Sequence, residues 1–193
     1  MLHKISLNLS ETLVKFGADK SKTAIYAYGL ECLLSTAIIL VIQFLIGAIM
    51  GRAFDVLIFT LFWLPLRVLV GGLHANTHFA CTVISVGLCI ASAALTYYIN
   101  KIPIWLIFAV CIASYCVIFS IAPVVHKNHP VSNLHRIKMR KAARIFGAVE
   151  LFLTALLYYL DCNCKASAFM GFFSTAVLAV MGYFSKNTIK RFD

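Results

Sequence analysis

Six long apolar blocks follow one another along the chain, separated by short polar stretches. They cover approximately residues 24–50, 53–73, 79–99, 102–125, 145–160 and 166–185. A helix needs roughly 20 mostly apolar residues to cross a bilayer. The pattern therefore predicts an all-α integral membrane protein with about six transmembrane helices. The fifth block is short and contains Glu150, so four spans plus a re-entrant hairpin are the alternative.

A different pattern precedes the first block. The stretch LHKISLNLSETLVKF repeats apolar residues at helical spacing, with lysines between them: Leu2, Ile5, Leu9, Leu13 and Phe16. This spacing predicts an amphipathic helix on a membrane surface, with a solvated tail as the alternative. We therefore expect one membrane domain over 1–193. It comprises an amphipathic segment (1–23), the transmembrane region (24–185) with a basic loop at 126–144, and a tail (186–193).

Composition and charge strengthen this prediction and orient the chain. Of the 193 residues 62% are hydrophobic and 12% charged, which leaves almost no chain for a soluble domain. If the N-terminus is cytoplasmic and six blocks cross, only three of the 17 Lys and Arg residues fall outside: Arg52, Lys101 and Lys165. Basic residues favour the cytoplasmic side, so both termini are expected there. Topology and attraction to anionic lipids explain the +10 net charge, and no motif indicates nucleic-acid binding.

The seven cysteines do not indicate a secreted disulfide framework, because their number is odd and most lie in apolar blocks. Those at 32, 89, 111 and 116 are interpreted as small hydrophobic residues. Cys162 and Cys164, in the short stretch DCNCK, receive no function.

The stretch GGLHANTHFAC, residues 71–81, gathers candidate chemistry at the end of the second block. On an unbroken helix His74 and Cys81 would share a face but lie roughly 10.5 Å apart along the axis, whereas a nucleophile and its base need about 3 Å. Gly71 and Gly72 permit unusual backbone angles, and Asn76 or Thr77 suits a helix N-cap. If the third helix begins there, His74 can fold back over Cys81, whose thiol at a helix N-terminus is more readily ionised.

Three interpretations of these residues compete. His78 lies one turn before Cys81 and is itself a candidate base or ligand. The histidines could be structural, or the spacing His-x-x-x-His-x-x-Cys could place three metal ligands on one helix face. The zincin signature, however, requires a glutamate where this chain has Ala75. The third interpretation is nucleophilic catalysis by a cysteine and a histidine, without metal or cofactor.

Two stretches resemble the accessory gene regulator B membrane peptidases of Gram-positive bacteria. The run RVLVGGLHANTHFAC has the arginine, Gly-Gly, histidine and cysteine in the spacing of that family. The run APVVHKNHP at 122–130 is similar to the family's Ala-Pro…Asn-Lys-Pro element, but has His129 where lysine is usual. Length, basic loops and number of spans agree, so the resemblance covers essentially the whole chain.

The resemblance implies a cysteine endopeptidase of the bacterial cytoplasmic membrane, and the distribution of basic residues places its active site at the cytoplasmic end of the second and third blocks. Such enzymes cleave a small propeptide through an acyl-enzyme thioester and help to cyclise it to a thiolactone or lactone quorum-sensing signal. By position, Cys81 is the nucleophile and His74 its base, while Arg67 and Gly72 match positions needed for activity. A small amphipathic AgrD-like propeptide, membrane lipids and a second copy in a homodimer are the expected partners.

Other polar residues are candidates for supporting roles. Glu31, Arg67 and Glu150 are expected at similar depth near the cytoplasmic boundary, where ionisable groups are usually paired or functional. Arg67 is interpreted as one member of a structural ion pair or as a group that holds substrate or orients the loop. The group that orients His74 could be Glu31, Glu150 or Asn76, and His78 could contact substrate.

The basic stretch at 126–144 is explained by topology and lipid contact, or by docking of an acidic propeptide tail. The main alternative function is a small membrane transporter or peptide exporter, in which Glu31, Arg67 and Glu150 would line a path. The chain lacks an ATP-binding loop and a clear inverted repeat, which argues against it. A metal-dependent membrane protein is the third possibility.

Overall fold

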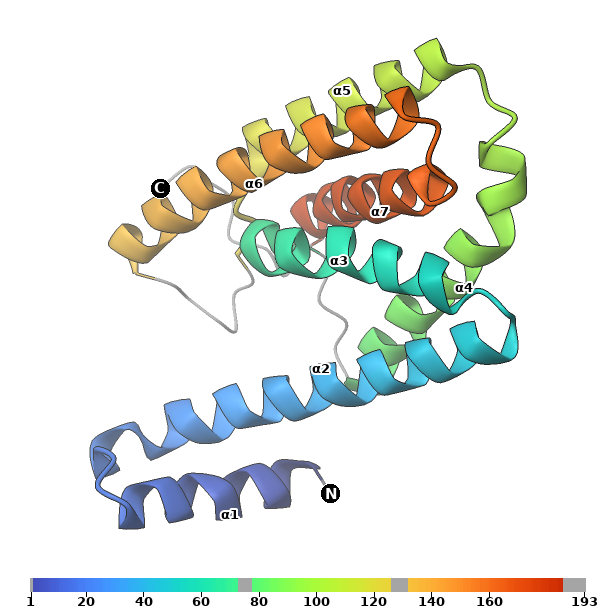
Figure 1. Cartoon of the computed structure of the whole chain (residues 1–193). Helices are drawn as coiled ribbons and strands as arrows, with labels where there is room; N and C mark the ends of the chain where they lie inside the picture. Colours follow the sequence, from blue (N-terminus) through green and yellow to red (C-terminus); the bar gives the residue numbers. More distant parts are fainter. Residues whose placement is uncertain (1, 73–77, 126–131, 186–193) are drawn as a thin grey trace.

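The computed structural model is almost entirely helical, and it describes residues 2–72, 78–125 and 132–185 (Figure 1). The helices are α1 (Leu2–Lys15), a short 3-10 helix η1 (Lys20–Lys22), α2 (Thr23–Ile49), α3 (Ala53–Val70), α4 (His78–Ile99), α5 (Ile104–Ile121), α6 (Asn133–Tyr159) and α7 (Lys165–Phe184). Six helices in these residues are long and apolar enough to cross a membrane. The predicted all-α fold with six transmembrane helices is confirmed.

The most enclosed helix is α7, which packs against α3, α4, α5 and α6. Its buried face is rich in small residues, among them Ala168, Gly171 and Ala179. Small side chains let transmembrane helices approach closely, where dispersion rather than hydrophobic burial drives association. A Cβ added at Gly171 would stand 2.7 Å from the Phe59 carbonyl oxygen of α3. Helix α7 is therefore the central element of the bundle.

The predicted boundaries need two corrections, both at sites of unusual backbone. Helix α3 ends at Val70 rather than at 73, because Gly71 has a φ of 72° that a right-handed helix excludes. Helix α5 ends at Ile121 rather than at 125, because Ala122 is extended before Pro123. In both cases the chain leaves its helix early to form the site described below.

The predicted basic loop over 126–144 is wrong for its second half. Residues from Asn133 onward are the first turns of α6, and Ser132 caps this helix by accepting a hydrogen bond from the His135 N–H at 3.3 Å. Only the later part of α6 is apolar, so the hydrophobic pattern does not show the cationic beginning of this helix. Helix α6 is one continuous helix of 27 residues. The alternative of a re-entrant hairpin is therefore wrong.

The N-terminal segment forms the predicted helix α1, which lies antiparallel beside α2 (Figure 1). Its contact with α2 uses small residues, since Ser6 and Ser10 are fully buried. The apolar side chains of Ile5, Leu9 and Phe16 are exposed and face away from this contact. The amphipathic helix is confirmed, and its place on a membrane surface stays a prediction.

Candidate functional site

The last turn of α3 is closed by Arg67. Its Nη1 donates a hydrogen bond of 2.6 Å to the carbonyl oxygen of Gly71, and the Gly71 N–H donates one of 3.0 Å to the Arg67 carbonyl. A cation near a helix C-terminus is favourable because the last carbonyls carry partial negative charge. Arg67 thus holds the chain where it leaves α3.

Gly72 follows in a conformation and a space that only glycine fits. Its φ is 127°, and an added Cβ would collide with the Arg67 Nη1 and stand 2.7 Å from the Leu178 carbonyl oxygen of α7. The guanidinium group of Arg67 therefore packs directly over the Gly72 backbone. This geometry gives Gly72, predicted from the resemblance, a physical role in positioning Arg67.

The short segments that follow α3 and α5 lie side by side and are hydrogen-bonded to each other. The Val124 N–H donates a 2.8 Å hydrogen bond to the Val70 carbonyl, and Gly71 and Val124 form an isolated parallel bridge. An added Cβ at Gly71 would collide with the Val124 carbonyl oxygen. We call residues 70–72 and 122–125 the crossover. It brings the start of the second quoted stretch, APVV, beside the Gly-Gly pair of the first.

Cys81 lies in the first turn of α4, which begins at His78. Its thiol is free and partly exposed, and the Arg67 guanidinium is close enough to interact with it electrostatically. Cys81 is thus near both the N-terminal end of α4, which carries partial positive charge, and the Arg67 cation. The structure thus brings Arg67, Gly72 and Cys81 to one end of the bundle.

The histidine predictions fall on a part of the chain that is not described. His74 and Asn76 lie outside the described residues, and of His78 only its place as the first residue of α4 is known. Pairing of His74 with Cys81 therefore stays a prediction. No three His, Cys, Asp or Glu residues come together as a metal site within 2–72, 78–125 and 132–185, the described ranges, which do not include His74.

The two candidate glutamates lie on helices that pack against α3 from different sides. Glu31 is a partly buried residue of α2, whereas Glu150 is buried on α6, and α3 lies between these helices in Figure 1. Within the described residues, Oε2 of Glu150 has no hydrogen-bond partner. The two glutamates are therefore not brought together, and a role for either one beside His74 stays a prediction.

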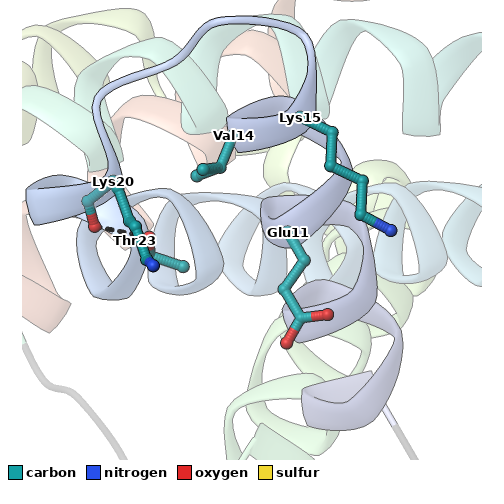
Figure 2. A pocket seen from close by; sticks show the side chains of 5 residues that line it. All are labelled: Glu11, Val14, Lys15, Lys20 and Thr23. Atoms are coloured by element: carbon teal, nitrogen blue, oxygen red, sulfur yellow. Dashed lines mark hydrogen bonds between the residues drawn. The ribbon is translucent and has the colours of Figure 1, made fainter.

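A separate pocket of about 370 Å³ lies where α1 turns into α2 (Figure 2). Glu11, Val14 and Lys15 of α1 line it together with Lys20 and Thr23, and the Thr23 hydroxyl donates a 2.7 Å hydrogen bond to the Lys20 carbonyl. The turn is braced by Asp19, whose pKa is lowered by hydrogen bonds from Ser21 and Lys22. None of the predicted site residues lines this pocket.

Sequence reasoning did not identify two backbone carbonyls as part of the site. Leu178 of α7 packs against Gly72 through its carbonyl, so its side chain gives no signal in the sequence. The Phe119 carbonyl near the end of α5 accepts hydrogen bonds from Arg144 at 3.3 and 3.2 Å. The helical spacing of the basic residues was the only sequence signal for Arg144.

The helices and the site define a multi-pass membrane protein with a partly exposed cysteine at a helix start, beside an arginine. The family model described as Accessory gene regulator B matches residues 3–185. The chain belongs to this family, which acts in quorum sensing in the processing of an autoinducer propeptide.

Two relatives from Clostridium perfringens support the same assignment. An AgrB-like protein of strain SM101 (Type A) is 28% identical over 170 residues, which cover 82% of this chain and 79% of the relative. A second AgrB-like protein, from strain 13 (Type A), is 26% identical with the same coverage. No solved structure matches the chain.

Proposed function

We propose that this protein is a cysteine endopeptidase that cleaves a small autoinducer propeptide and promotes cyclisation of the part that it retains. The observation that carries the proposal is the position of Cys81, partly exposed in the first turn of α4 and within electrostatic reach of Arg67. A cysteine nucleophile acts as its thiolate, and reactive cysteines are typically partly exposed and near a helix N-terminus or a cation. Family membership supports a role in propeptide processing.

The proposed reaction has two acyl transfers. The Cys81 sulfur attacks the scissile carbonyl carbon, a C–S bond forms, and the C–N bond breaks as His74 gives its proton to the leaving amine. A Cys or Ser side chain of the bound propeptide then attacks the thioester carbonyl. The C–S bond to Cys81 then breaks, the proton of the attacking group passes through His74 to the released Cys81 sulfur, and a thiolactone or lactone ring closes.

Water must be kept from the intermediate, because hydrolysis of the thioester would end the reaction before cyclisation. The crossover beside the site is enclosed, since Val70, Ala122 and Val124 are all buried. Amide-to-thioester exchange is uphill, so forward flux depends on tight binding of the substrate or removal of the released fragment. We place the site on the cytoplasmic side of the bacterial membrane, in a homodimer, as part of the proposal.

The nucleophile is tested by Cys81→Ser. Because an alcohol is far less ionised than a thiol at neutral pH, this variant should keep the fold and lose propeptide cleavage. Cys89→Ser is the matched control, since Cys89 is a buried thiol of the same helix and should leave cleavage near the wild-type rate. Cleavage of a co-expressed propeptide is followed by gel mobility and mass spectrometry. Full cleavage by Cys81→Ser would exclude Cys81 as the nucleophile.

A further inference from the structure

The turn between α6 and α7 carries two cysteines separated by one residue, Cys162 and Cys164. Both thiols are free and partly exposed. Cysteines that share a helix are less well placed to pair. Those of α5 lie on different faces, since Cys111 is buried and Cys116 is exposed, and the two of α4 are about 12 Å apart along its axis. The turn therefore holds two thiols that the chain itself keeps close together.

The backbone of the turn brings the two cysteines within the range of a disulfide. The Lys165 N–H donates a 3.1 Å hydrogen bond to the Cys162 carbonyl, and Cys164 has a φ of −89° and a ψ of 1°. These angles are those of the third residue of a type I turn, of which Cys162 is the first. Residues two apart span at most about 7 Å when extended, and less in a turn. Disulfides join Cα atoms about 4.4–6.8 Å apart.

The side chains are also near each other, and neither sulfur is committed to another role. Burial raises the pKa of the Cys164 thiol, and the nearby Cys162 adds to this shift. Cys164 is the N-cap residue of α7, but its side chain makes no capping hydrogen bond. Catalytic dithiols contain a thiol with a lowered pKa. The raised pKa of Cys164 therefore argues against a redox-enzyme motif and favours a structural disulfide.

Backbone hydrogen bonds tie each cysteine to a different helix. The Cys162 N–H donates one of 3.0 Å to the Leu157 carbonyl of α6, and the Cys164 carbonyl accepts one of 3.1 Å from the Ala168 N–H of α7. A bond between the two sulfur atoms would therefore fasten the end of α6 to the beginning of α7, the central helix of the bundle.

We propose that Cys162 and Cys164 are a disulfide-forming pair, oxidised by a low-molecular-weight disulfide on the side of the membrane that is predicted to be outside. The turn adjoins Lys165, one of the basic residues expected on that side, and disulfides persist in oxidising compartments. The inference does not depend on the proposed peptidase function.

The proposed oxidation takes two thiol–disulfide exchanges. One cysteine thiolate attacks a sulfur of the oxidant, whose S–S bond breaks, so that a first small thiol leaves and a mixed disulfide remains. The other cysteine attacks the mixed disulfide, forms the bond between Cys162 and Cys164, and releases the second small thiol. Two electrons and two protons thus pass from the cysteine pair to the oxidant.

Oxidation is measured on the full-length protein in detergent. The protein is reduced, freed of reductant and incubated with oxidised glutathione, and the remaining thiols are blocked with N-ethylmaleimide. Trypsin then releases residues 145–165, a peptide that contains both cysteines of the turn and no other cysteine. We expect most of this peptide to lack two hydrogens and to carry no maleimide. The reaction should be faster at alkaline pH than at neutral pH, because the pKa of Cys164 is raised.

Cys162→Ser and Cys164→Ser are the matched controls. Each leaves one thiol in the turn, so its peptide should carry one glutathione or one maleimide. The same peptide is then analysed from intact cells that are quenched with acid before the maleimide is added. In wild-type cells it should already be oxidised, and a membrane-impermeant phosphine should reduce it.

Three results would overturn the inference. A peptide with two glutathiones and no internal bond would mean that the turn holds the sulfur atoms apart. Disulfide-linked dimers on a non-reducing gel, lost in both serine variants, would mean that the thiols pair between two copies of the chain. A reduced peptide in quenched cells would mean that the turn does not meet an oxidising compartment.

Discussion

Gly72 gives the clearest test at the scale of single residues. Gly72→Ala places a Cβ against the Arg67 guanidinium and the Leu178 carbonyl, in a backbone conformation with a φ of 127°. The strained backbone alone costs about 1–2 kcal/mol, and relief of the collision must displace Arg67 or α7. We expect a lower thermal unfolding temperature in detergent and a large loss of propeptide cleavage.

Gly87→Ala is the matched control for that change. Gly87 lies inside α4, and a Cβ added there would meet nothing within 4 Å. Alanine is the better helix former by up to about 1 kcal/mol, so this variant should be as stable as the wild type or more so, and fully active. If Gly72→Ala behaved in the same way, the close packing of Arg67 over Gly72 would have no part in function.

His74 is tested through the reactivity of Cys81. If His74 is the base, His74→Ala should slow alkylation of Cys81 by iodoacetamide at neutral pH, and raising the pH should restore the rate because hydroxide then removes the proton. Mass spectrometry of the peptide that contains Cys81 separates its modification from that of the other cysteines. His78→Ala should have the smaller effect, since His78 is predicted to pack or to contact substrate.

A zinc site predicts a different result from the same set of variants. Chelators would then abolish cleavage, and His74→Ala and His78→Ala would lose bound metal together. Cleavage that resists chelators, with a loss specific to His74, supports the cysteine–histidine pair. Cleavage that chelators remove, with equal losses at both histidines, would contradict it.

At the scale of elements, Arg144 of α6 connects this helix to the C-terminal end of α5. Its guanidinium donates to the Phe119 carbonyl and stacks 3.9 Å from the centre of the Phe119 ring. Arg144→Ala should lower the free energy of unfolding by about 1 kcal/mol, the order expected for a partly exposed hydrogen-bonded cation. Hydrogen exchange should become faster at Ala122–Val125, which follow α5. Lys141→Ala, at an exposed position, should alter neither quantity.

The helices were largely predictable because the bilayer interior permits few backbone conformations. Apolar runs of sufficient length must be helices, since only helices satisfy every backbone group within the run. The beginning of α6 was not predicted, because the prediction relied on apolar runs. Residues 133–144 are helical but polar, and they precede the apolar part of α6.

The parts of the site that depend on the chemistry of a residue type could be predicted from the sequence. The parts that depend on backbone hydrogen bonds could not. Cys81, Arg67 and the glycines are residue types with special chemistry or backbone freedom, so the sequence displays them. The crossover depends on backbone hydrogen bonds between Val70 and Val124, and two valines carry no sign of this pairing.

At the scale of the whole molecule, the alternation of the helices places the ends of α3, α5 and α7 together with the beginnings of α4 and α6. The cationic turns of α6 and the site around Cys81 are therefore at one end of the bundle. The turns after Ile99 and Tyr159 are at the other end, with Lys101 and Lys165 as their cations. The positive-inside rule then predicts that the first end faces the cytoplasm.

Cysteine accessibility tests this assignment in whole cells. In a background without native cysteines, Lys101→Cys and Asn163→Cys occupy exposed positions at the end assigned to the outside, and His135→Cys and Lys141→Cys occupy exposed positions at the other end. A membrane-impermeant maleimide should label the first pair in intact cells and the second pair only after permeabilisation. The lipid bilayer excludes the charged reagent, so labelling reports the side directly. Labelling of His135→Cys in intact cells would move the Cys81 site to the outside. The propeptide would then have to cross the membrane before cleavage rather than after it.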